Sequence, residues 1–126
     1  MPALLYDTGA LVAAERRHPL IWRLHDRANA ARIAPVVLVV VLVQAWRGGP
    51  QHNLSRLLRG CRIMPDDEIS GRAAGRACAA AGTSDVVDAL VVVTATQLAA
   101  PVVTSDPDDL THLAVSLGAT LALHAL

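Results

Sequence analysis

The sequence predicts an α/β fold with a mostly parallel central sheet. Short apolar runs, as long as buried strands, alternate with longer segments in which apolar residues recur at helical spacing. Apolar residues make up 53% of the 126-residue chain, which is enough for one sizeable core, and no linker or internal repeat divides it. We therefore expect a single domain over residues 1–126.

The first part of the chain is expected to form one strand and two helices. Residues 3–6 (ALLY) are an apolar run that ends at Asp7, which is typical of a buried strand. Residues 9–17 follow as a short helix. Pro19 suits the first turn of the next helix, over residues 19–30, because its missing N–H would have no partner there.

Residues 32–35 (RIAP) are predicted to form a second short strand, but the segment after them is ambiguous. The β-branched residues of segment 36–46 favour a strand. Its place between Pro35 and the Gly48-Gly49 pair instead allows a buried helix that stops at a glycine.

The rest of the chain continues the alternation. Segment 85–99 is apolar nearly all round, so it should be a buried helix, capped by Thr83 or Ser84. Gly118 is expected to close the last helix. The other predicted elements are helices 51–59, 67–81 and 108–118 and strands 61–64, 101–104 and 119–124.

Composition excludes some classes of function. Aromatic residues are nearly absent, which argues against proteins that stack single-stranded bases on aromatic platforms. The net charge is zero, so the chain lacks the overall basic character of many nucleic-acid binders. All eleven positively charged residues are arginines between Arg16 and Arg76, and the only charged residues in segment 77–126 are aspartates. This asymmetry either arises by chance or reflects an acidic centre next to surfaces that carry arginine. The planar guanidinium group of arginine is suited to binding phosphate.

Cellular location is predicted from cysteines and apolar runs. Cys61 and Cys78 have neither zinc-site spacing nor histidine partners, as expected of buried thiols in a reducing cytoplasm. The longest apolar run, 36–43, is far shorter than the about 20 residues of a membrane helix. With no signal peptide apparent, we expect a cytoplasmic protein that makes no use of a membrane.

Three carboxylates from distant parts of the sequence are expected at one edge of the sheet. Asp7 ends the first strand, Asp106 follows strand 101–104, and Asp88 lies in the first turn of the buried helix. Ligands of open α/β sheets bind beyond the carboxyl ends of the strands. Because crowded carboxylates repel one another and Mg²⁺ prefers oxygen ligands, the pattern indicates a divalent metal.

Each acid also has an ordinary structural explanation. Asp7 suits the cap of helix 9–17, and Asp106 a turn before Pro107. The D-x-x-D pattern of Asp85 and Asp88 is similar to a capping box. Asp108 and Asp109 stand at a helix start, where acids are common.

Four motifs, in order along nearly the whole chain, resemble the PIN-domain ribonucleases, and specifically the VapC-type toxins of toxin–antitoxin pairs. They are LLYDTGALVAAE, VVLVQAWRGG, GTSDVVDALVV and VVTSDPDDL. The resemblance implies a three-layer α/β/α sandwich that cuts RNA with Mg²⁺ or Mn²⁺. It places Asp7, Asp88 and Asp106 as the first, third and fourth metal-binding acids, with Asp109 at a further polar position. It also favours a helix for segment 36–46.

The chain departs from the family pattern at the second acid, where Gln44 stands in place of the usual glutamate. An amide oxygen can still face a metal or a water, but it carries no charge and cannot take up a proton. We expect weaker metal binding and no general-base role for this residue, which would orient a water or a ligand. Gln44 is otherwise an ordinary polar residue at a helix end.

The resemblance also implies partners. The expected substrate is structured RNA, and the expected regulator is a VapB-type antitoxin that fills the acidic cleft, with an arginine as one option; a homodimer is expected too. Asp85, Thr104 and Ser105 are candidate accessory residues of the site. Four arginines, each equally compatible with a solvated helix face, are candidates for holding the RNA backbone: Arg16, Arg17, Arg23 and Arg47.

Two other functions are considered. One is a PIN-like binding module with a weakened site, which Gln44 favours. The other is a small phosphatase on a Rossmann-like sheet, which the D-T-G start weakly suggests. Position 9 is glycine where such enzymes need a second aspartate, and the chain has no lysine, so the ribonuclease is preferred.

Overall fold

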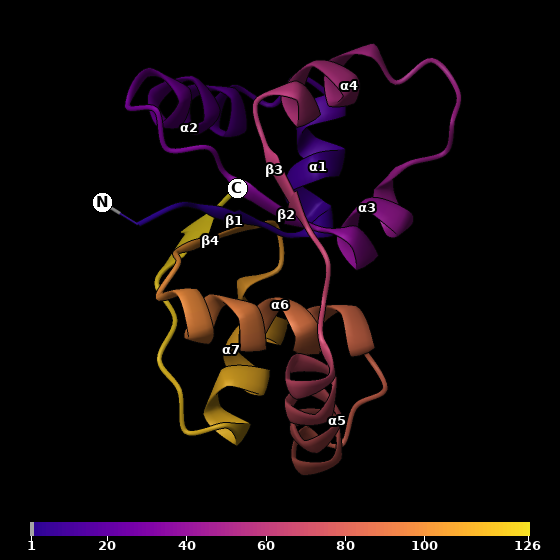
Figure 1. Cartoon of the computed structure of the whole chain (residues 1–126), viewed down its shortest axis with the longest axis vertical. Coiled ribbons are helices and arrows are strands. Elements are labelled where there is room, and N and C mark those ends of the chain that lie inside the picture. The colour runs from indigo at the N-terminus through magenta and orange to yellow at the C-terminus, as the bar shows by residue number, and fades with distance from the viewer. Residues whose placement is uncertain (1) are drawn as a thin grey trace.

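The computed structural model describes residues 2–126, in which five parallel strands form one sheet of order β3-β2-β1-β4-β5 (Figure 1). The strands are β1 (Leu5–Tyr6), β2 (Val36–Leu38), β3 (Arg62–Met64), β4 (Val102–Thr104) and β5 (Leu123–Ala125). The helices are α1 (Thr8–Glu15), α2 (Pro19–Ala30), α3 (Val39–Ala45), α4 (His52–Arg59), α5 (Glu68–Ala81), α6 (Val86–Leu98) and α7 (Pro107–Ser116).

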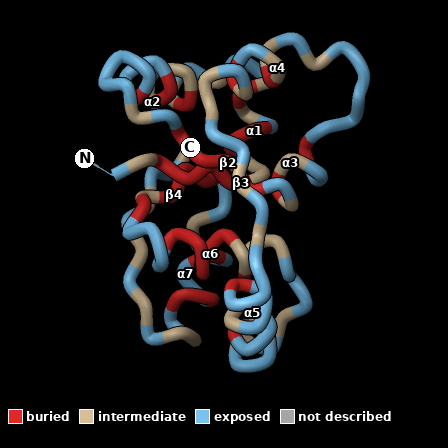
Figure 2. Tube along the Cα trace, in the orientation of Figure 1, coloured by how far each residue is buried: buried red, intermediate tan, exposed pale blue. Residues whose placement is uncertain are grey.

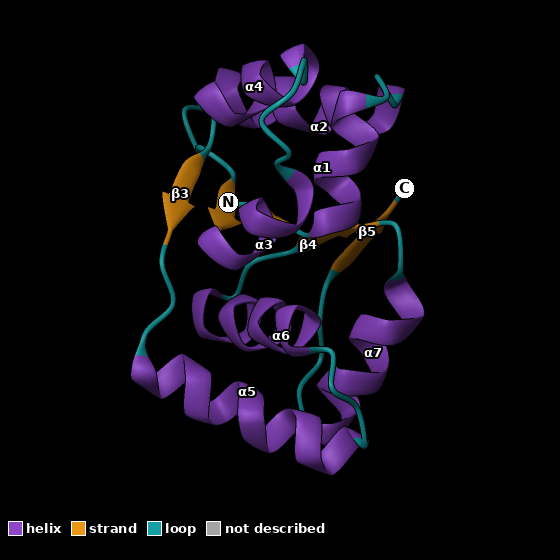
Figure 3. Ribbon diagram, turned by 90° about the vertical axis from the view of Figure 1, so that its right-hand side faces the viewer, coloured by secondary structure: helices purple, strands orange, loops and turns teal. Residues whose placement is uncertain are grey.

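Helices cover both faces of the sheet (Figure 3). Helices α1, α2 and α4 lie on one face, and α5, α6 and α7 lie on the other. The three central strands are fully buried, and α6 is the most buried of the helices (Figure 2). This confirms the predicted three-layer α/β/α sandwich, and the near absence of aromatics explains why the core is built from valine, leucine and alanine.

The order of the strands defines one special position in the sheet. The chain runs outward from β1 through β2 to β3, and then returns to the other side of β1 to form β4 and β5. Strands β1 and β4 pair in parallel, with Leu5 opposite Val102 and Tyr6 opposite Val103. Their carboxyl ends therefore open side by side at the point where the strand order reverses, which is where open α/β sheets bind ligands.

The second strand lies later in the sequence than predicted. Residues 32–35 are not a strand, because Arg32 leaves α2 with a φ of 59° and the chain is still turning there. Strand β2 is instead Val36–Leu38, which pairs with both β1 and β3. The ambiguous segment 36–46 thus contains both a strand and a helix, since α3 begins directly at Val39.

Two further boundaries differ from the predictions. The cap of α6 is Asp85 rather than Thr83 or Ser84, because the Asp85 carboxylate accepts from the Asp88 N–H at 3.3 Å. The last strand is β5, later than the predicted 119–124. Gly118 adopts a left-handed φ of 65° just beyond α7, close to its predicted place.

Polar side-chain contacts fix α1 against α4 and α2 against the sheet. The Glu15 carboxylate, at the end of α1, accepts from the Leu54 N–H of α4 at 2.7 Å. The hydroxyl of Tyr6 lies 2.9 Å from Nδ1 of His25 in α2, and both side chains are buried. These contacts hold the two helices that border the cavity described below.

Within residues 2–126 no single helix is long and apolar enough to cross a bilayer, and only α5 and α6 together, across a 117° bend, reach the required length and composition.

Candidate active site at the carboxyl edge of the sheet

Asp7 is held rigidly at the end of β1. Its side chain is only 4% exposed, and its Oδ1 accepts from the Ala10 N–H at 2.9 Å, which caps α1. The buried hydroxyl of Thr104 also hydrogen-bonds to this carboxyl group. Burial raises the pKa of Asp7, and these hydrogen bonds only partly oppose the rise. Asp7 is therefore both the predicted cap and a buried carboxyl group at the switch point.

Thr104 connects Asp7 to Asp106. Its Oγ1 accepts from the Asp106 N–H at 2.8 Å, while its hydroxyl bonds to Asp7. The side chain of Asp106 is exposed and shares a hydrogen bond with the side chain of Asp109. This hydrogen bond is the main cause that raises the pKa of Asp106, and desolvation is the second. One buried threonine thus links the carboxyl group of Asp7 to the backbone of Asp106.

Asp88 approaches the same edge from the first turn of α6. Burial, a hydrogen bond to Asp85 and the charges of Asp85, Asp7 and Asp109 together raise its pKa to about 7. Asp85, Asp88 and Asp109 also line a small cleft of about 100 Å³. The fold therefore gathers Asp7, Asp88, Asp106 and Asp109, with Asp85 beside them.

None of these acids forms an ion pair within residues 2–126. In the described chain the one ion pair joins Arg72 to Glu68, on the exposed surface of α5. Hard cations such as Mg²⁺ take carboxylate oxygens, so the donor set fits such an ion. The side chains are nevertheless not closed around a common point: no three histidine, cysteine or acidic side chains between residues 2 and 126 lie close enough together to hold a metal.

Gln44 lies beside the acids through a single contact. The Thr8 hydroxyl, one residue after Asp7, donates to the Gln44 Oε1 at 2.6 Å. This contact joins the start of α1 to the end of α3. The amide oxygen of Gln44 is therefore already paired with a donor, although the residue as a whole is exposed.

Gly9 allows α1 to begin close against the loop after β4. A Cβ atom at this position would collide with Oγ of Ser105 and lie 3.0 Å from its Cβ and 3.3 Å from its backbone nitrogen. The close approach brings Thr8 and Ser105 together, next to Asp7 and Asp106. Ser105 thus packs at the border of the site and no contact places it within the acid cluster.

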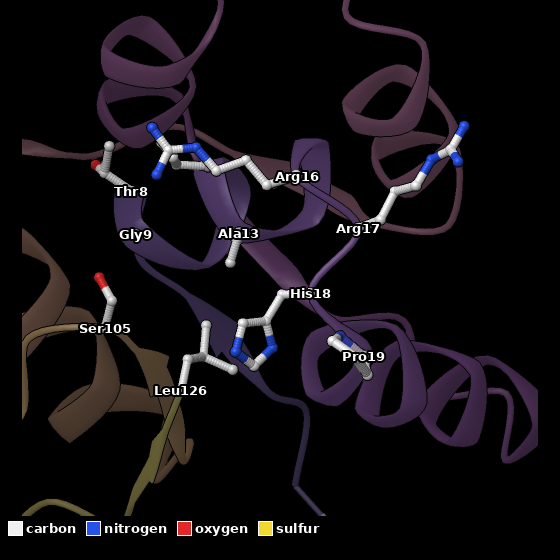
Figure 4. A pocket seen from close by; sticks show the side chains of 10 residues that line it. Thr8, Gly9, Ala13, Arg16, Arg17, His18, Pro19, Ser105 and Leu126 are labelled. Atoms are coloured by element: carbon white, nitrogen blue, oxygen red, sulfur yellow. The ribbon is translucent and has the colours of Figure 1, made fainter.

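The predicted arginines divide into two groups. Arg16 and Arg17 line a cavity of about 590 Å³ that also borders Thr8 and Ser105 (Figure 4). Arg23 lies on the exposed surface of α2, outside this cavity. Arg47 uses its Nη1 to hold the end of α3, donating to the carbonyls of Val43 and Trp46.

The cavity contains residues that the sequence reasoning missed. His18 and Leu126 also line it, and their side chains lie next to each other. They belong to no sequence motif, because the cavity forms only when residues 8–19 fold against Ser105 and Leu126. The cap position of His18, whose Nδ1 accepts from the Leu20 N–H at 3.3 Å, was the one local signal.

Asp88 should make the stability of the metal-free protein depend on pH in an unusual direction. Its folded pKa of about 7 lies above the ordinary aspartate value of 3.8, so the folded state binds more protons than the unfolded chain between these values. The free energy of unfolding should therefore fall as the pH rises from about 4 to about 7. Thermal unfolding in EDTA between pH 5 and pH 7.5 measures this.

The variant Asp88→Asn isolates this effect. It removes the titrating group, so its melting temperature should fall less steeply with pH than that of the native protein and should be higher near pH 7.5. Parallel pH profiles for the two proteins would contradict the assignment of the raised pKa to Asp88.

Replacing Gly9 with alanine should destabilise the protein by about 1–3 kcal/mol, the usual cost of overpacking. The matched control is Gly75→Ala in α5, where a Cβ would meet nothing within 4 Å. The control should be neutral or more stable by about 0.5–1 kcal/mol, because alanine is the better helix former. Urea denaturation measures both.

A second substitution tests the cause. Adding Ser105→Gly to Gly9→Ala removes the colliding Oγ and Cβ atoms and should restore part of the lost stability. If the double variant is no more stable than Gly9→Ala, contact with Ser105 is not the reason for glycine at position 9.

Comparison with known proteins supports the fold. No family model matches the sequence, and no curated protein matches it. Among solved structures, VapBC2 from Rickettsia felis bound to a promoter DNA fragment is similar at a TM-score of 0.72 and 17% identity, covering 98% of each chain. DNA-bound VapBC from Salmonella typhimurium is similar at 0.70 and 14%, covering 99% of this chain and 98% of that one.

A third similar structure is PAE2754 from Pyrobaculum aerophilum, with a TM-score of 0.66 and 17% identity over 97% of this chain and 83% of that one. At such identities the similarity concerns the fold. It agrees with the resemblance in the four sequence motifs, and this chain has the PIN-domain fold of VapC-type proteins.

Proposed function

We propose that this protein is a metal-dependent endoribonuclease toxin of the VapC type, restrained by a VapB-type antitoxin in the cytoplasm. The observation that carries the proposal is the gathering of Asp7, Asp88 and Asp106 at the switch point of the sheet, where none of them forms an ion pair with another described residue. Acids in this arrangement are unfavourable alone and favourable around a divalent ion.

Asp7, Asp88 and Asp106 would hold Mg²⁺ or Mn²⁺. Such an ion supplies a water of lowered pKa and offsets charge that builds on the phosphate. The chain's own residues provide the geometry: Thr104 and the Ala10 N–H fix the orientation of Asp7, and Thr104 also fixes the backbone of Asp106. Gln44 cannot accept a proton, so it acts by orienting its neighbours.

The proposed partners follow from the similar structures and the motifs. VapBC and FitAB are the molecules named for structures of similar fold, which supports a cognate antitoxin here. Structured RNA is the proposed substrate. Arg16 is better placed for its backbone than Arg47, whose guanidinium is engaged in holding α3.

A homodimer is proposed through an apolar face of α3. Val39, Val43 and Trp46 recur at helical spacing, and their side chains are 40%, 66% and 41% exposed. An apolar stripe of this kind is better explained by a partner surface than by contact with water.

The variant Val43→Glu should shift the protein from dimer to monomer, because it places a charge in the centre of that face. Light scattering after size-exclusion chromatography gives the mass of each species. The matched control is Val115→Glu on α7, where the side chain is similarly exposed at 70%. A native protein that is monomeric, or a dimer that survives Val43→Glu, would contradict the proposed face.

The ribonuclease proposal predicts discrete fragments when a mixed pool of transfer and ribosomal RNA is incubated with the protein and Mn²⁺ or Mg²⁺. Asp88→Asn and EDTA should each abolish them, since both remove metal binding. Gel analysis of end-labelled RNA measures the fragments. Fragments that persist in both controls would indicate a contaminating nuclease and contradict the proposal.

The alternative is a PIN-like binding module that no longer cuts RNA, and Gln44 is the feature that favours it. The variant Gln44→Glu distinguishes the two, because a glutamate can still accept from Thr8 and adds a charge. It should strengthen Mn²⁺ binding, measured by calorimetry, on the order of tenfold. Cleavage by the variant combined with none by the native protein would support the binding module.

A further inference from the structure

A cavity lies beside the acidic edge, along α1. Thr8 and Ser105 form one end of it, and these residues are the direct sequence neighbours of Asp7 and Asp106. From there it runs along α1 to the start of α2 (Figure 4). Its volume of about 590 Å³ lies within the range of pockets that enclose small organic ligands.

The polar groups of the cavity suit an anion. The guanidinium of Arg16 extends over the cavity toward Thr8, whereas that of Arg17 points away from it (Figure 4). Between residues 2 and 126 Arg16 takes part in no ion pair, so its fork of donors remains for a ligand. A guanidinium in this position matches the geometry of a phosphate group.

The other walls suit a flat, partly apolar group. Val12, Ala13, Pro19 and Leu126 provide apolar surface, and the ring of His18 projects into the cavity toward Leu126. Since Nδ1 of His18 accepts from the Leu20 N–H, Nε2 is the ring nitrogen left to face a ligand. A histidine ring can stack on a base and hydrogen-bond to a nucleoside.

We propose that this cavity holds one unpaired nucleotide of the RNA, next to the phosphodiester that lies at the acids. Arg16 binds the phosphate, and His18 with the apolar wall binds the nucleoside. The inference rests on the proposed function, because that function places the phosphodiester at Asp7 and Asp106. Structured RNA offers such nucleotides in loops, where bases are unstacked and turn outward.

RNA fits this cavity better than an acidic protein segment does. One arginine and one histidine stand against a mostly apolar wall, which matches one phosphate and one base. A run of carboxylates would need several cations, and Arg17 points elsewhere. One end of the cavity is lined by Thr8 and Ser105, the sequence neighbours of Asp7 and Asp106, so one strand of RNA could reach both places.

The test measures RNA binding without cleavage. Fluorescence anisotropy with a labelled single-stranded octanucleotide in EDTA gives the affinity of the native protein and of Arg16→Gln and His18→Asn. Asparagine can still cap α2, so the second variant should fold normally. The control is Arg76→Gln, which removes an equally exposed arginine on α5, on the other face of the sheet.

Arg16→Gln should weaken binding several-fold and reduce the slope of log affinity against log salt by about 0.7, the value for one phosphate contact on a single strand. His18→Asn should weaken binding at every salt concentration and leave the slope unchanged. Arg76→Gln should change neither. Native affinity and slope in both cavity variants, with thermal unfolding showing that they fold, would overturn the proposal.

A second measurement identifies the ligand class directly. The His18 ring resonance, assigned by its loss in His18→Asn, should shift on titration with adenosine or uridine monophosphate. A shift with inorganic phosphate alone, or with an acidic peptide and not with nucleotides, would overturn the proposal. Neither measurement needs RNA cleavage, so a protein that binds as expected but does not cut would refute only the ribonuclease.

Discussion

The arrangement of the site depends on the hydroxyl group of Thr104. It lies at the last position of β4, is completely buried, and bonds both to the Asp7 carboxyl group and to the Asp106 N–H. The backbone supports the same junction, since the Asp7 N–H donates to the Val103 carbonyl at 3.2 Å. Parallel pairing brings the two strand ends together, and Thr104 converts that proximity into a fixed relation between two acids.

That fixed relation has an electrostatic cost. Asp7 is buried and Asp88 is half-buried, and burial is the main cause that raises the pKa of each carboxyl group. A fold selected only for stability would replace such groups or pair them with one of its eleven arginines. In the described part of the chain no arginine forms an ion pair with these acids, which fits the proposed metal site, where a bound cation would supply the missing charge.

Much of the fold could be predicted from the sequence, because strand ends and helix caps leave local signals. The alternation of short and long apolar segments predicted an α/β fold with a mostly parallel sheet, and the resemblance in the four motifs implied the three-layer sandwich. Asp7, Asp88 and Asp106 were placed by the rule that sites form at the carboxyl ends of strands. Local signals failed in segment 36–46, where eight apolar residues in a row carry no periodicity to separate β2 from α3. Pairing with β1 and β3 decides that boundary, and it is not visible in the segment itself.

The contacts that surround the acids could not be predicted, because they join distant residues. No residue near Gly9 in the sequence indicates that Ser105 will pack against it. The cavity likewise forms only where residues 8–19 contact Ser105 and Leu126. The same holds for Gln44. Gln44 stands where the resembled family usually has a glutamate, which suggested a weakened metal site. In the structure its amide oxygen accepts a hydrogen bond from Thr8, one residue from Asp7.

This contact gives Gln44 a structural role, because it joins the start of α1 to the end of α3. A glutamate there would add a negative charge beside Asp7, where burial already opposes the charged form. With glutamine, the same bridge between α1 and α3 forms without that repulsion. Glutamine in place of glutamate therefore lowers the negative charge available to a metal, and it also reduces the electrostatic repulsion among the remaining acids. A site tuned in this way would bind its ion more weakly and still keep Asp7, Asp88 and Asp106 in place.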